Sequence, residues 1–214
     1  MKRIFFKFMT IAGIISSILF TTITVLSGYF QIDYNPINNF VSELGATNSS
    51  TEDLMNYVGF IPSGILFSLF GLSLFIIFSK KITSRIGALL IILFGIGMAL
   101  AGIFSCDLGC PPNGTFESII HDRVSAVTFI SAILGINLLG FSFKKNYYFR
   151  NISVYTILTG FISLILLIIM INSFDSKNLT GLWQRLLLLS IFIWTIIIGL
   201  RAFKYFDELK TNPD

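Results

Sequence analysis

Six long apolar segments, separated by short polar ones, dominate the pattern of the chain. They cover about residues 8–30, 55–79, 84–105, 117–141, 152–173 and 182–204. Each approaches the roughly 20 residues that an α-helix needs to cross the hydrocarbon core of a bilayer. The pattern predicts an all-α fold, a bundle of six transmembrane helices that forms a single integral membrane domain over residues 1–214. The first apolar run is too long for a signal peptide and lacks an A-x-A-like site, so we expect an uncleaved anchor.

A shorter amphipathic pattern follows the first apolar segment, in the sequence YNPINNFVSELG at residues 34–45. Four apolar residues there recur at i, i+3, i+4 and i+7: Ile37, Phe40, Val41 and Leu44. Asn35 can cap a helix and Gly45 can end it. The pattern therefore predicts a short amphipathic helix in the first external loop, with Asn39 and Glu43 on its polar side. Such a helix could cover a site as a lid or seal the bundle as a plug.

Basic residues are distributed unevenly among the loops. Twelve of the fifteen lie in the N-terminal segment, in the turns KKITSR and KKNYYFR, and in the C-terminal tail. The opposite loops and helix ends keep three: Arg123, Lys177 and Arg185. The positive-inside rule then predicts that both termini are cytoplasmic, in the cell (inner) membrane. The outward segments would be residues 31–54, 106–116 and 174–181.

The composition agrees with a membrane protein and excludes several other classes. Hydrophobic residues make up 54% of the 214 residues and charged residues 12%, about half the share in soluble domains. The net charge of +4 does not indicate nucleic-acid binding, because the basic residues belong to the loops. One His and two Cys do not provide the three or more ligands of a zinc centre. We expect no metal and no cofactor.

Small residues in the second and third apolar segments predict that these two helices pack closely. They are Gly64, Ser68 and Gly71 in the second segment and Gly95, Gly97, Ala99, Ala101 and Gly102 in the third. Gly97 and Ala101 form a small-x-x-x-small pair. Pro62 is expected to kink the second helix.

The only two cysteines lie four residues apart in the sequence CDLGCPPNG, in a segment expected to face outward. A disulfide can persist outside the cell, so we predict a Cys106–Cys110 disulfide. The alternative is two free thiols at a turn. The spacing alone is a weak metal motif.

Polar residues gather at the outward ends of the fourth and sixth segments. Ser118, His121, Asp122 and Ser125 share one face of the fourth helix. His121 could transfer protons or bind a ligand, or it could be an interfacial His that a neighbouring carboxylate orients. We favour the second, structural interpretation.

Arg185 lies about one turn inside the sixth segment, in the sequence TGLWQR. An Arg so close to lipid usually has a partner or reaches headgroups. It could bind the phosphate or carboxylate of a ligand, or form an ion pair with Glu43, Asp107 or Asp122, and both readings stay open. The ligand-binding candidates are Arg185, Gln184, Asn39 and Asp122.

We expect Glu43, His121 and Arg185 to approach one another at the outer mouth of the bundle, beneath the short helix. The sequence favours a non-catalytic protein that interacts with a lipid or another ligand. The alternative is an enzyme that acts on an outer-leaflet lipid, with Glu43 and His121 as acid and base and Arg185 holding an anion. A transporter is disfavoured because the segment centres are almost purely apolar. The implied partners are a membrane lipid and, for an accessory subunit, another membrane protein.

Four motifs together resemble one family. They are NPINNFVSELG after the first segment, FSCDLGCPP after the third, a His near the start of the fourth, and GLWQRLLL at the sixth. The chain resembles, over about residues 8–204, the prokaryotic membrane proteins grouped as domain of unknown function 998. The resemblance implies six membrane helices and a bacterial or archaeal origin, but no activity. Gln184 stands where the family pattern GLWER has Glu, so no charge-dependent role is implied there.

Overall fold

A computed structural model describes residues 2–78 and 81–208 of the chain. Six of its helices are long and apolar enough to cross a membrane, and the described residues contain no β-strand. The six α-helices are α1 (Lys2–Phe30), α2 (Ile61–Ile77), α3 (Ile82–Ile103), α4 (Phe116–Phe143), α5 (Ser153–Asn172) and α6 (Thr180–Glu208). The predicted six-helix, all-α fold is confirmed. The predicted end of the second segment at residue 79, and the basic residues Lys80 and Lys210, lie outside the described residues.

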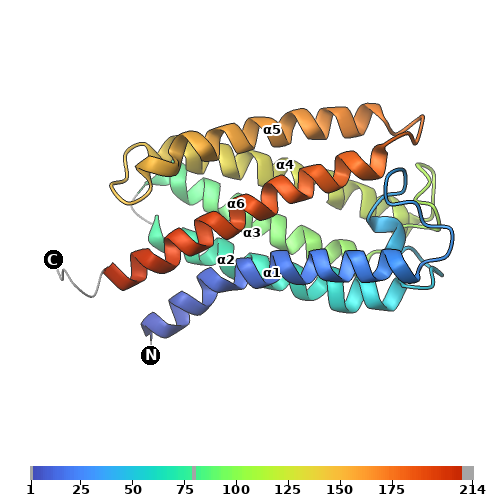
Figure 1. Cartoon of the computed structure of the whole chain (residues 1–214), viewed down its shortest axis with the longest axis horizontal. Helices are drawn as coiled ribbons and strands as arrows, with labels where there is room; N and C mark the ends of the chain where they lie inside the picture. The colour runs from blue at the N-terminus through green and yellow to red at the C-terminus, as the bar shows by residue number, and fades with distance from the viewer. Residues whose placement is uncertain (1, 79–80, 209–214) are drawn as a thin grey trace.

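The six helices form a ring in chain order. Each packs against its neighbours in the sequence, and α6 returns to pack against α1. Figure 1 shows both chain ends at the same end of the bundle. The opposite end, where the loops 31–53, 104–115 and 173–179 meet, is called here the disulfide end, and residues 31–53 are called loop 1.

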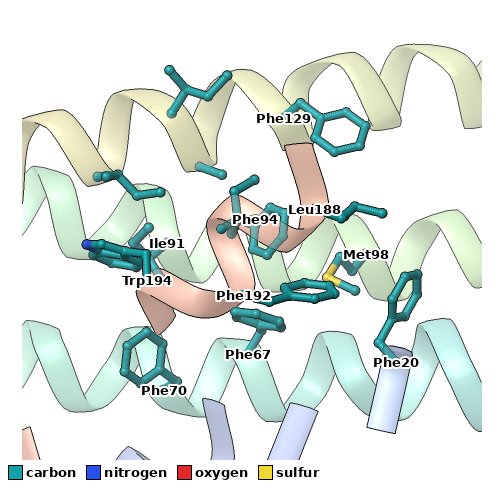
Figure 2. Close-up of a cluster of buried hydrophobic side chains, with 14 of the residues drawn as sticks. Phe20, Phe67, Phe70, Ile91, Phe94, Met98, Phe129, Leu188, Phe192 and Trp194 are labelled. Atoms are coloured by element: carbon teal, nitrogen blue, oxygen red, sulfur yellow. The ribbon is translucent and has the colours of Figure 1, made fainter. Parts of the chain in front are cut away.

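Aromatic side chains fill the centre of the ring. Phe67 and Phe192 lie with ring centroids 5.6 Å apart, and Phe94 meets Phe67 edge to face at 4.9 Å. Figure 2 shows these rings together with the buried side chains of Phe20 and Trp194. The centre is filled mainly by apolar side chains, with a few buried hydroxyl groups among them.

Helices α2 and α3 approach so closely that side chains would not fit between them. A Cβ atom at Gly64 would lie 2.5 Å from the Gly95 oxygen, and one at Gly71 would lie 2.7 Å from the Ile92 nitrogen. The predicted tight packing is confirmed for these glycines. Gly97 differs from the expectation, because its Cα faces Thr128 on α4 rather than α2.

A π-helix, η2 (Leu54–Phe60), precedes α2 and continues directly into it. Pro62 follows it at the first turn of α2, where its missing N–H is tolerated. The π-helical segment lies on the N-terminal side of Pro62 and ends where the Ile61 N–H bonds to the Asn56 oxygen. The kink expected at Pro62 stays a prediction.

Loop 1 contains a short helix, but it is a 3-10 helix of four residues, η1 (Ser42–Gly45), rather than a continuous helix from Asn35. Asn35 does cap a turn, because its side chain accepts the Ile37 N–H at 2.9 Å. The Asn38 and Asn39 N–H groups also bond within this turn, to the Asn35 oxygen at 3.1 and 2.8 Å. The chain leaves the helical path at the two residues that follow, because their N–H groups bond to side chains. Phe40 donates to Glu43, and Val41 donates to Gln184 on α6.

Candidate functional site

Loop 1 caps the N-terminus of α6. The first N–H groups of a helix lack partners within it. Here the Leu182 N–H bonds to the Ile37 oxygen at 2.8 Å, and the Gly181 N–H bonds to the Asn38 oxygen at 3.3 Å. Gly181 has no room for a Cβ, which would lie 2.8 Å from the Pro36 oxygen. Figure 1 shows loop 1 beside the start of α6.

The Arg185 side chain also binds loop 1 through hydrogen bonds. Its Nη1 donates to the Asn39 oxygen at 3.1 Å and to the Gly181 oxygen at 3.0 Å, while Nη2 bonds to the hydroxyl of Tyr34. The Tyr34 hydroxyl in turn donates to the Phe40 oxygen at 2.9 Å. Burial raises the pKa of Tyr34 above its ordinary value of 10.0, against the opposing effect of Arg185. These contacts support a structural role for Arg185, with two backbone oxygens and a phenol as its partners.

Glu43 and Gln184 hold the middle of loop 1. One Glu43 carboxylate oxygen accepts the Asn39 side-chain amide at 2.8 Å, and the other accepts the Phe40 N–H at 2.8 Å. The buried Gln184 accepts the Val41 N–H at 2.6 Å. A Glu at this position could accept the same bond, so the departure of GLWQR from GLWER preserves this anchor.

A pocket of about 230 Å³ lies between loop 1 and the loop after α3, and is called here the acidic pocket. Its lining residues are Gln31, Ile32, Asp33, Tyr34, Asn39, Glu43, Leu108 and Gly109. Two of them are carboxylates, and two are apolar side chains that remain strongly exposed, Ile32 at 81% and Leu108 at 65%. The acidic pocket can therefore contact a cation and an apolar group together.

A second, buried cavity of about 40 Å³ lies below loop 1. Ser42, His121 and Gln184 contribute polar groups to its lining, above Phe20, Phe94 and other apolar residues of the core. Such a volume suits a water molecule better than a ligand. Residues 39–43 separate the two spaces, so Glu43 lines the acidic pocket while His121 lines the buried cavity.

The His121 imidazole, only 4% exposed, binds the C-terminus of α3. Its Nδ1 lies 2.7 Å from the Phe104 oxygen and 3.1 Å from the Ala101 oxygen. Ala101 belongs to the last turn of α3 and Phe104 is its C-cap, and carbonyl groups at this end of a helix lack helical partners. This geometry requires a proton on Nδ1, and it supports the structural interpretation of His121. Its sequence neighbour Asp122 is exposed and lines neither space.

Cys106 and Cys110 are paired at disulfide distance, with Cα atoms 5.1 Å apart, as predicted from the sequence. The pair lies against loop 1. Cys106 Sγ is 3.7 Å from the Ser42 backbone oxygen, and Cys110 Sγ is 3.5 Å from the Ser42 hydroxyl. The ring that the disulfide closes contains Leu108 and Gly109, which form one wall of the acidic pocket.

The sequence interpretation missed several residues of this site. Tyr34 is the first residue of the sequence YNPINNFVSELG and Asp33 precedes it, but neither was a candidate site residue, and both line the pocket. Asn56 ties the far end of loop 1 to the bundle, since its amide donates to the Gly45 oxygen and to Ser105 Oγ, both at 2.9 Å. An Asn in an apolar segment was an available signal, because such residues seek partners inside the bundle.

Charge at the disulfide end is predominantly negative. Three basic residues, Arg123, Lys177 and Arg185, face eight acidic ones among the described residues. These acidic residues are Asp33, Glu43, Glu52, Asp53, Asp107, Glu117, Asp122 and Asp175. A cleft surrounded by charges of one sign attracts ligands of the other sign.

Comparison with known proteins gives one match. A family model described as "Protein of unknown function (DUF998)" matches residues 14–201, a stretch that includes both spaces and the disulfide. No curated protein and no solved structure matches the chain.

Proposed function

The chain belongs to the DUF998 family, and we propose that it is a non-catalytic membrane protein that binds the amine-bearing headgroup of a phospholipid in the acidic pocket. The observation that carries the proposal is the pairing of Asp33 and Glu43 in one pocket with exposed apolar walls. Each Glu43 oxygen already accepts one hydrogen bond, and a carboxylate oxygen can accept another. An ammonium group in the pocket would donate hydrogen bonds to the carboxylates of both Asp33 and Glu43.

The size and surroundings of the pocket favour a lipid headgroup over a larger molecule. At about 230 Å³ it is smaller than the roughly 300–1,000 Å³ of sites for drug-sized ligands. Exposed aromatic residues flank it at the end of α1, with Tyr29 at 82% and Phe30 at 59% exposure. Aromatic residues at this level are typical of the membrane–water interface. The rest of a phospholipid would lie along this apolar rim.

Lys177 supplies a positive charge at the edge of the same pocket. Its Nζ donates to the backbone oxygen of Gly109 at 3.4 Å, and Gly109 lines the pocket. A zwitterionic headgroup, with an ammonium group and a phosphate, therefore matches the charges better than a simple amine does. This proposal differs from the sequence-based alternative in which Arg185 holds the anion, because Arg185 already donates three hydrogen bonds to protein oxygens.

The enzyme alternative receives less support from the geometry. Acid–base catalysis by Glu43 and His121 requires both groups within reach of one substrate. The two side chains line different spaces, and the His121 Nδ1 proton is held by α3. Headgroup binding requires no proton transfer, and it uses only the acceptor capacity that the Glu43 oxygens retain.

The test is a calorimetric titration of the purified protein with short-chain phosphatidylethanolamine and, separately, phosphatidylglycerol. We expect at least tenfold tighter binding of the ethanolamine lipid. Asp33→Asn should weaken that binding about tenfold, the effect of losing one contact of about 1.4 kcal/mol. Asp175→Asn is the matched control, because it removes an exposed charge at the same end that lines neither space. Equal binding of the two lipids, or an Asp33→Asn protein that binds like wild type, would overturn the proposal.

A further inference from the structure

We propose that the Cys106–Cys110 disulfide controls the acidic pocket, so that its reduction weakens binding of the headgroup. The inference rests on the proposed function. It follows from the position of the disulfide ring: the residues that form one wall of the pocket, Leu108 and Gly109, lie between the two cysteines.

The ring holds the pocket wall in a backbone conformation that is unfavourable without it. Cys110 has a φ of 44°, in the left-handed region that residues other than Gly rarely adopt. Gly109 precedes it with a φ of 79°, and the Cys110 N–H closes a turn onto the Asp107 oxygen at 2.8 Å. Once the S–S bond is broken, Cys110 can return to negative φ. That change would move Gly109 and Leu108 away from the pocket.

The disulfide is also where the two sides of the pocket meet. Both sulfur atoms contact Ser42, which directly precedes Glu43 in loop 1. A wall that relaxes at Cys110 therefore separates from the segment that carries the Glu43 carboxylate. The pocket would widen, and a bound ammonium would lose its contact with one side.

The rest of the site does not depend on the disulfide. The Thr47 N–H bonds to the Cys106 oxygen at 2.8 Å, and Asp107 accepts the Thr115 N–H at 2.6 Å and its hydroxyl at 2.9 Å. These bonds keep the loop after α3 attached to loop 1 and to α4 when the thiols are free. Reduction should thus change binding while leaving the six-helix fold intact.

Accessibility determines which sulfur a reductant attacks. Cys106 is fully buried, whereas Cys110 is partly exposed. A dithiol reductant would attack Cys110 Sγ with one thiolate, and the S–S bond would break with Cys106 leaving as a thiolate. The second thiol of the reductant then displaces Cys110. Overall the protein gains two electrons and two protons to give two thiols, and the reductant is oxidised to its own disulfide.

The experiment compares binding of short-chain phosphatidylethanolamine by the oxidised protein, the protein reduced with dithiothreitol, and the double variant Cys106→Ser/Cys110→Ser. We expect the reduced protein to bind at least fivefold more weakly than the oxidised protein. The double variant should match the reduced protein and should not respond to dithiothreitol. Circular dichroism and thermal unfolding of each sample establish that the helices are intact. The reduced wild-type protein provides the measurement should the double variant fail to fold.

Two outcomes separate this inference from the function on which it rests. Equal binding by the oxidised and reduced proteins, with Asp33→Asn still weakening it, would overturn redox control alone. Absence of binding by the oxidised wild-type protein would overturn both. A double variant that binds as tightly as the oxidised protein would also contradict control by the disulfide.

Discussion

At the scale of single residues, His121 and Arg185 both bind backbone oxygens at helix ends and in loop 1. Nδ1 of His121 binds two carbonyl groups at the end of α3, and the guanidinium of Arg185 binds Asn39 and Gly181. A buried carbonyl group without a partner costs about 1–3 kcal/mol. Both side chains therefore stabilise the ends of helices and the loop between them, whether or not a ligand is present.

We predict that His121→Leu lowers the free energy of unfolding by about 1–3 kcal/mol, because it leaves the Phe104 and Ala101 oxygens unpaired. His121→Asn should recover most of the loss, since its amide nitrogen can occupy the position of Nδ1. Denaturant unfolding in detergent measures both variants. An Asn variant as unstable as the Leu variant would contradict the capping role.

The sequence indicated which polar residues lie at the disulfide end but not what they contact. Helical spacing and the apolar segments sufficed to bring Asn39, Glu43, Gln184 and Arg185 to the same end of the bundle. Their hydrogen bonds depend on three-dimensional packing, because Asn39 and Arg185 are 146 residues apart. From the sequence, an anion site and an ion pair were both open for Arg185, whereas its hydrogen-bond partners in the structure are two backbone oxygens and the Tyr34 hydroxyl.

At the scale of elements, the contact between α2 and α3 depends on the absence of side chains. Helices in lipid gain little from burying apolar surface, so they associate through close packing and hydrogen bonds. Gly64 and Gly95 allow the two backbones to touch, and the Ser68 hydroxyl bonds back to the Gly64 oxygen at 2.9 Å. Larger residues at these positions would force the helices apart.

We predict that Gly64→Ala lowers the free energy of unfolding by about 1–3 kcal/mol, because the new methyl group has no space beside α3. The matched control is Gly28→Ala. A Cβ there would meet only Tyr34 at an ordinary 3.4 Å, so the protein should be as stable as wild type or about 0.5–1 kcal/mol more stable. Thermal unfolding of the two variants in the same detergent makes the comparison. Equal stability of both would show that the α2–α3 contact can adjust.

The regular elements could be predicted from the sequence, and the irregular ones could not. Each membrane helix satisfies its backbone internally, so apolar length alone was sufficient evidence for it. No comparable local rule predicts the backbone conformation of loop 1. Its helical pattern was real, but the Phe40 and Val41 N–H groups bond to Glu43 and Gln184, and this competition shortens the helix to Ser42–Gly45. The π-helix before Pro62 also depends on packing around Asn56.

At the scale of the whole molecule, the two ends of the bundle differ in charge. Among the described residues, the end with the chain termini carries ten of the thirteen basic residues, and the disulfide end carries eight of the ten acidic ones. The orientation rule counts Lys and Arg in short loops. This distribution supports an orientation with the acidic pocket outside the cell, where a disulfide can also persist.

We predict that reporter fusions after Lys81 and Arg150 report a cytoplasmic location, and that reporters inserted in loop 1 report an external one. The physical reason is the difficulty of moving the basic turns across the membrane. Alkaline phosphatase and green fluorescent protein provide complementary signals at each position. A cytoplasmic signal from loop 1 would reverse the orientation and place the acidic pocket on the other side.

Loop 1 is held by the last helix of the chain, and this has a consequence for biosynthesis. Val41 lies 143 residues before its anchor Gln184, so the ribosome completes loop 1 long before α6 emerges. Until then the N–H groups and carbonyl oxygens of the loop have no partners on α6. A nascent chain that stalls or terminates before α6 would carry residues 37–41 without these partners, while Asn56 and Cys106 hold the far end of the loop. Proteolytic quality control could therefore distinguish unfinished chains from finished ones by cleavage within loop 1.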